Sequence, residues 1–151
     1  MFSLHRERTG RSAHEAPAGE AAYARPMRVT RVYTGDDEQS HFEDLEIPEE
    51  DTAHGWLSAP VPARVVVFRR TPPCGSLDFH LAPRRQFVIM LTGAVEIECG
   101  DGAVRRFAAG DVILADDTTG QGHISREVEA PRRSVFVVLP DDLDVSRWRG
   151  P

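Results

Sequence analysis

Clusters of Gly, Pro and Asp divide the sequence after residue 26 into short segments, and this punctuation restricts the fold more than any other feature. Ten apolar or alternating runs lie between the clusters, none longer than nine residues. Runs of this length fit β-strands better than helices. They are MRVTRVYT, HFEDLEI, ARVVVFRR, LDFHLA, QFVIMLTG, AVEIECG, AVRRFAA, DVILAD, GHISRE and RRSVFVVLP. Ten short strands separated by turns predict an all-β sandwich or barrel.

The run at residues 86–93 is apolar on both faces, unlike the alternating run that follows it. In a strand, Gln86, Val88 and Met90 would point to one side, and the residues between them to the other. We therefore expect a strand covered on both sides, with one face toward a barrel lumen. The other face would meet a second sheet, a terminal arm or another subunit, so a homodimer is predicted.

A length of 151 residues suits one compact domain. Residues 1–26 are rich in Ala, Arg, Gly, Glu and Pro, which predicts a disordered tail, with Met27 as an alternative start. We expect residues 27–60 to form strands that pack on the barrel or on a partner subunit. The barrel itself is expected at residues 61–140, and a C-terminal tail at residues 141–151.

The charge and the cysteines narrow the range of partners. A net charge of −6 and isolated Arg pairs argue against nucleic acid binding, which requires a concentrated basic surface. No run has the length and hydropathy of a membrane span or of a secretory signal. Cys74 and Cys99 form no CxxC pair, so reduced thiols and a cytoplasmic location are expected, with Cys99 in the core.

Two motifs resemble those of the cupin superfamily of small β-barrels. In the first cupin motif, two histidines one residue apart precede a glutamate and a turn glycine. Here His80, Gln86 and Gly93 match the first histidine, the glutamate and the glycine in spacing, while Ala82 replaces the second histidine. The resemblance implies an antiparallel jelly-roll barrel, or double-stranded β-helix.

In the second cupin motif, a glycine and an aspartate open a strand, and a histidine follows about a dozen residues later. Gly110, Asp111 and His123 match it with one extra residue. The resemblance covers roughly residues 61–139, and small single-domain bacterial cupins carry similar segments. It implies that His80 and His123 face a common lumen.

Metal-binding cupins hold Fe, Mn, Ni or Zn with three histidines and a glutamate. By resemblance, His80, His123 and Gln86 are candidate ligands of a divalent metal, although a neutral amide is a weaker ligand than a carboxylate. Asp78, two residues before His80, or His41 in an N-terminal strand could supply a missing ligand. The two histidines could instead be hydrogen-bonded core residues, with Gln86 bridging neighbouring strands.

Further ligand contacts are predicted from Gln86, Arg85, Gln121 and Met90. Arg84 and Arg85 carry forked donors suited to an anion, or they occupy a solvated turn after a proline. Gln121 lies in the segment ADDTTGQGH, which could form a lip of the barrel.

Turn formation is the favoured role for the acidic residues of that segment. Asp116 and Asp117 are expected to bond their own backbone, as such residues commonly do in turns. Trp56 and Trp148 are expected to cover the barrel ends or to mediate subunit packing.

Two functions follow. In the first, a small organic molecule enters the barrel, and His80 and His123 hold a metal or act as general acid and base. Isomerisation, dehydration, cyclisation or metal-dependent oxygenation would fit such an enzyme. The alternative is a metal-free module that binds or senses a metabolite without changing it. No helix-turn-helix segment is evident, which disfavours a stand-alone transcription factor.

Overall fold

A computed structural model describes residues 26–73 and 75–150. The described part is built almost entirely from β-strands, as the sequence predicts. The strands are β1 (Met27–Thr34), β2 (Ser40–Ile47), β3 (Glu49–Thr52), β4 (Gly55–Ser58), β5 (Val65–Thr71), β6 (Ser76–His80), β7 (Gln86–Glu98), β8 (Val104–Ala108), β9 (Val112–Asp116) and β10 (His123–Val138). One 3-10 turn, η1 (Ser146–Trp148), follows them. No helix in the described ranges has the length and apolar character needed to cross a bilayer.

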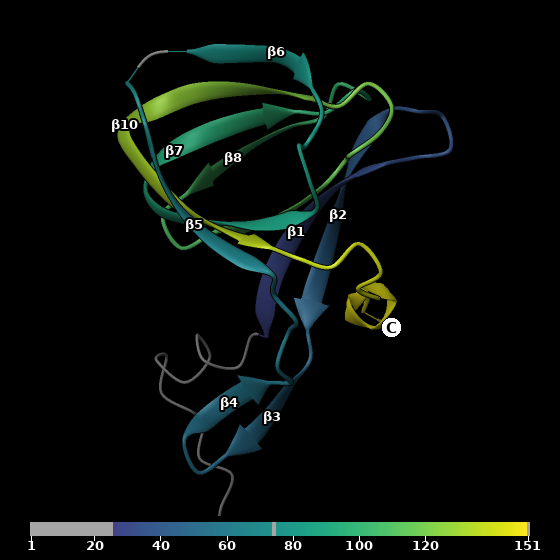
Figure 1. The fold of residues 1–151 in the computed structure, drawn as a ribbon, viewed down its shortest axis with the longest axis vertical. Helices are drawn as coiled ribbons and strands as arrows, with labels where there is room; N and C mark the ends of the chain where they lie inside the picture. The colour runs from purple at the N-terminus through teal and green to yellow at the C-terminus, as the bar shows by residue number, and fades with distance from the viewer. Residues whose placement is uncertain (1–25, 74, 151) are drawn as a thin grey trace, which may run out of the picture.

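Eight of the strands form one sheet, paired in the order β2-β1-β9-β7-β10-β5, with β6 also on β10 and β8 also on β7. The path is open, with β2 and β5 at its ends, so the pairing does not describe a closed barrel. The sheet is mixed rather than purely antiparallel, because β1 and β9 run parallel. Strands β5, β6, β7, β8 and β10 curve around one another in the upper part of Figure 1, while the β3–β4 hairpin lies at the opposite end.

Two strands are longer than the sequence pattern suggests. The runs at residues 86–93 and 94–100 form the single strand β7, and the two C-terminal runs form β10. Gly93, predicted to be a turn residue, lies inside β7 with φ of 72°. A Cβ there would lie 2.5 Å from the carbonyl oxygen of Glu129. Glycine therefore permits β7 and β10 to bend together while they stay in contact.

The prediction of coverage on both faces is confirmed for residues 86–90, whereas Leu91 is exposed. On one face, Phe87 joins a buried cluster with Leu114 and Leu139, and its ring stacks on Trp148 with centroids 6.0 Å apart. On the other face, Met90 packs in a second cluster around Phe107. The first cluster also contains Val145 and Trp148, so the C-terminal segment covers this face of the strand.

The chain after residue 140 is therefore not a free tail, since Val145 and Trp148 are buried. Trp56 is exposed on β4. Cys99 is buried as expected, and burial raises the pKa of its thiol to about 12. Cys74 and residues 1–25 of the tail predicted at residues 1–26 lie outside the described residues.

Candidate functional site

A cavity of about 380 Å³ opens inside the curved sheet. Its walls come from β1, β5, β6, β7, β9 and β10, and from residues 81–83 after β6. Most of the lining is apolar, including Val32, Val88, Val95, Ile97, Ile113 and Phe136. The charged, titratable or amide side chains on the wall are Arg69, His80, Gln86, His123 and Arg132. A mainly apolar cavity with a few polar groups is the usual form of a small-molecule site.

The two histidines of the predicted motifs meet at this cavity. His80 ends β6, His123 begins β10, and the two are directly opposite in the antiparallel β6–β10 ladder. Their ring centroids are 4.4 Å apart, with an angle of 57° between the ring planes. Gly122 makes this approach possible, because a Cβ there would lie 2.1 Å from the carbonyl oxygen of His80.

Both imidazole rings are anchored through the Nδ1 atom. His80 Nδ1 lies 2.8 Å from the carbonyl oxygen of Asp78, and His123 Nδ1 lies 2.5 Å from Oδ2 of Asp117. Carbonyl and carboxylate oxygens accept hydrogen bonds, so each Nδ1 carries the proton and donates. In a neutral ring, Nε2 then holds the lone pair. Two such atoms can accept a proton, bind a metal or bond a ligand hydroxyl.

Gln86 and Ala82 also line the cavity, so the first motif keeps its positions in space. Gln86 is almost fully buried, and its Oε1 accepts a bond of 3.2 Å from Nε of Arg84. Ala82 donates its backbone N–H to the carbonyl oxygen of Asp117 at 3.1 Å. This bond ties the segment after β6 to the residue that anchors His123.

The other residues predicted to contact a ligand lie elsewhere. Met90 belongs to the core cluster around Phe107. Gln121 is exposed and donates its backbone N–H to the carbonyl oxygen of Glu38. Arg85 is buried, with its guanidinium bonded to the carbonyl oxygens of Asp141 and Leu143, so it holds the C-terminal segment instead of lining the cavity.

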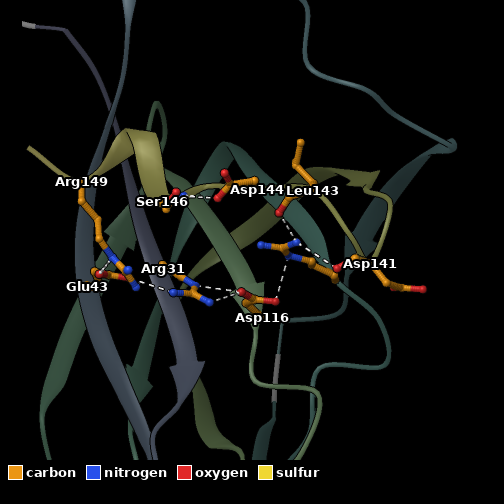
Figure 2. A network of polar contacts seen from close by, with 9 residues as sticks. Arg31, Glu43, Asp116, Asp141, Leu143, Asp144, Ser146 and Arg149 are labelled. Carbon is orange, nitrogen blue, oxygen red and sulfur yellow. Dashed lines mark hydrogen bonds and ion pairs between the residues drawn. The ribbon is translucent and has the colours of Figure 1, made fainter.

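Asp116, predicted to shape a turn, instead joins charged groups from three parts of the chain. Its Oδ2 lies 2.6 Å from the Arg31 guanidinium, and its Oδ1 lies 2.9 Å from Nε of Arg85. Figure 2 shows the network continuing from Arg31 to Glu43 and Arg149. Burial acts to raise the pKa of Glu43, but the hydrogen bonds from Arg149 and Arg31 together outweigh it and lower that pKa. These contacts are structural.

Asp117 is the site residue that the sequence analysis missed. Its side chain is fully buried, and its Oδ2 anchors His123 while Oδ1 has no hydrogen-bond partner among the described residues. Burying a carboxylate with an unpaired oxygen reduces the stability of the fold. The sequence could not indicate this role, because an aspartate in a Thr- and Gly-rich loop can bond either its own backbone or a distant ring, and the local pattern is the same in both cases.

Neither alternative metal ligand reaches the cavity. Asp78 is exposed, and its carboxylate accepts the backbone N–H of Phe79. His41 lies between Asp37 and Asp101, with each contact at 2.9 Å. The hydrogen bond to Asp37, and secondarily that to Asp101, raises the pKa of His41, while the same contact lowers the pKa of Asp37.

We expect His41→Gln to lower the melting temperature more at pH 6 than at pH 9. A raised histidine pKa in the folded state stabilises the fold below the unfolded value of about 6.5. That contribution disappears as the pH rises through the folded pKa. The lowered pKa of Asp37 acts above about pH 4 and is lost in acid. Melting curves of wild type, His41→Gln and His54→Gln, the last at an exposed turn, check this; a pH-independent difference would contradict it.

The donor set does not match the metal centre of metal-binding cupins. At the cavity, the chain offers two imidazoles and the amide of Gln86. Among residues 26–73 and 75–150, no three His, Cys, Asp or Glu side chains gather in a group that could hold a metal ion. Catalytic metal sites ordinarily use three protein ligands. A divalent ion here would depend on water for most of its coordination, so we derive no step through a metal.

A scan of protein-family models and a search of curated proteins found no match to this sequence. The function is therefore inferred from the site alone.

Proposed function

We propose that the protein is a cupin-like, single-domain protein that binds a small organic molecule in the cavity and acts on it with His80 and His123 as an acid–base pair. The observation that carries this proposal is the pair of imidazoles, 4.4 Å apart between ring centroids, each anchored through Nδ1 at the cavity wall. The motif spacing supports the jelly-roll relationship, since the positions that hold the metal ligands in the cupin motifs, here His80, Ala82, Gln86 and His123, all line one cavity.

The arrangement suits proton transfer. Imidazole is effective near neutral pH, and a pair of rings can divide the work, one accepting a proton while the other donates. The apolar walls exclude water and so strengthen electrostatic contacts with a bound molecule. Isomerisation, dehydration and cyclisation require only such proton transfers. Oxygenation fits less well, because it needs a firmly held redox metal.

A non-catalytic binding module is the second candidate. The mainly apolar lining of the cavity favours it, because such a surface can retain a metabolite without any reaction. The two candidates differ only in whether the bound molecule is changed. The homodimer and the cytoplasmic location stay predictions.

A thermal-shift screen with small organic acids, amides, alcohols and sugars tests the proposal. We expect at least one class to raise the melting temperature of the wild type, since a ligand that binds only the native state stabilises it. His80→Ala and His123→Ala should each lower the affinity for that ligand by roughly 10-fold or more while the protein stays folded. His54→Ala, far from the cavity lining, is the matched control.

Two results would contradict the proposal. One is an undiminished shift in the His80→Ala/His123→Ala double variant, and the other is the absence of any stabilising compound. Mass analysis of each ligand after incubation then separates the two candidates: a changed ligand, with no change in the double variant, indicates an enzyme. An unchanged ligand favours the binding module.

A further inference from the structure

The cavity lining includes two arginines as well as the two histidines. Arg69 of β5 and Arg132 of β10 both line it, together with Phe136. The Arg69 guanidinium carbon lies 5.5 Å from the centroid of the Phe136 ring. His123 begins β10, whereas Arg132 and Phe136 belong to its second half. β10 therefore contributes a histidine to the cavity from its first residue and an arginine from its second half.

One of these arginines is neutralised and the other is not. Arg132 is buried, and its Nε donates to both carboxylate oxygens of Glu127 at 2.8 and 2.9 Å. Arg69 has no ion-pair partner in the part of the chain that the structure describes. Two guanidinium groups with a single paired carboxylate leave one net positive charge. No carboxylate side chain from the described residues lines the cavity to balance it.

Arg69 is exposed overall, and its guanidinium is partly desolvated and close to Arg132. Loss of surrounding water, and then the nearby Arg132, lower the pKa of the Arg69 guanidinium, with Glu127 opposing them only in part. An anion in the cavity would relieve the repulsion between the two arginines.

Two buried hydroxyl groups lie on the same face of the sheet as the arginines, although neither belongs to the cavity lining. In the β5–β10 ladder, Thr71 is opposite Arg132 and Ser134 is opposite Arg69, so all four side chains share one face of the sheet. The Oγ1 of Thr71 and the Oγ of Ser134 are buried and have no hydrogen-bond partner among the described residues. Buried hydroxyls normally find a partner.

We infer that the cavity takes a small monocarboxylic acid with an apolar body, its carboxylate paired with Arg69 beside Arg132 and its chain directed along the apolar wall toward His80 and His123. Guanidinium groups bind carboxylates through parallel N–H donors, which gives both charge compensation and orientation. The apolar lining fits the remainder of such a molecule. This inference depends on the proposed function, because it assigns the chemical class of the same ligand.

Matched pairs of acids and amides test the inference with the full-length protein. The probes are hexanoate and hexanamide, and 3-phenylpropanoate and 3-phenylpropanamide, each titrated by calorimetry. We expect each acid to bind the wild type roughly 10-fold or more tightly than its amide, because a hydrogen bond to a charged group contributes more than a neutral one. Arg69→Gln should abolish this preference.

Arg70→Gln is the matched control, because Arg70 is the next residue on β5 and does not line the cavity. It should keep the preference for the acid. His80→Ala should weaken the binding of the acid and of the amide by the same factor, so the ratio of their dissociation constants should not change.

The outcomes separate the inference from the proposed function. Equal binding of acid and amide by the wild type would overturn the inference but leave the cavity as a small-molecule site. A preference that survives in Arg69→Gln would also overturn it, since the charge would then lie elsewhere. Binding of neither acid nor amide would overturn the inference and, if the screen of other compound classes also fails, the proposed function with it.

Discussion

Gly122→Ala is expected to reduce the free energy of unfolding by about 2–5 kcal/mol and to separate His80 from His123. Gly122 has φ of 78°, a left-handed conformation that costs a side-chain-bearing residue about 1–2 kcal/mol. In addition, its Cβ would lie 2.1 Å from a backbone oxygen of His80. Because that atom is backbone, β6 and β10 must move apart, and overpacking of this kind costs about 1–3 kcal/mol.

Gly102→Ala isolates the conformational effect. Gly102 has φ of 82°, nearly the same conformation, but no atom lies within 4 Å of the position that a Cβ would occupy there. The free energy of unfolding of Gly102→Ala should therefore fall only by the cost of the left-handed conformation, about 1–2 kcal/mol. Chemical denaturation of both variants gives the difference. Equal losses in the two would mean that β6 and β10 do not approach as closely as the structure has them.

Asp117→Asn is expected to lower ligand affinity or turnover by roughly 10- to 100-fold without loss of stability, as for other residues that orient a functional histidine. The substitution keeps the shape of the side chain but removes a carboxylate whose Oδ1 has no partner among the described residues. The free energy no longer spent on burying a charge offsets the loss from a weaker hydrogen bond to Nδ1 of His123, so the stability is unchanged. The ring then loses the acceptor-only carboxylate that fixes its tautomer, because an amide can present either an oxygen acceptor or an N–H donor to Nδ1.

Asp116, the neighbouring residue, provides a control that should lose stability and keep ligand binding. Asp116 contacts Arg31 and Arg85 and does not line the cavity. Asp116→Asn should lower stability by about 3 kcal/mol, because it leaves two largely buried arginines without their shared carboxylate, while ligand binding is retained. Thermal melts and ligand titrations of both variants check the pair. If Asp117→Asn destabilises the protein as much as Asp116→Asn and binds ligand normally, Asp117 has only a structural role.

Much of the strand pattern could be predicted because alternation and turn residues are local signals. The run at residues 27–34 coincides with β1, and the runs for β2, β5, β8 and β9 lie within one or two residues of the observed bounds. The continuity of β7 through Gly93 could not be predicted, since a glycine inside a bent strand has the composition of a turn. The β3–β4 hairpin was missed because the strand Glu49–Thr52 is polar and shows no alternation.

Long-range contacts account for what the sequence could not supply at the site. Motif spacing was enough to bring His80, Gln86 and His123 together, because it counts residues along strands that pair with one another. It could not place Arg85, whose backbone-carbonyl partners lie beyond residue 140, or Arg69, which reaches the cavity from β5. Asp117 was assigned to a turn because its bond to His123 depends on how the loop folds back over β10.

Nitrogen NMR of the histidine rings tests the central claim most directly. Long-range proton–nitrogen spectra of labelled protein, assigned with single His→Gln variants, report which ring nitrogen carries the proton. The account predicts that Nδ1 carries a proton in both His80 and His123. It also predicts that the strongest ligand from the screen shifts the Nε2 signals of these two rings, and not those of His41 or His54. An Nδ1 without a proton in either ring, or a ligand that binds without shifting the two Nε2 signals, would contradict it.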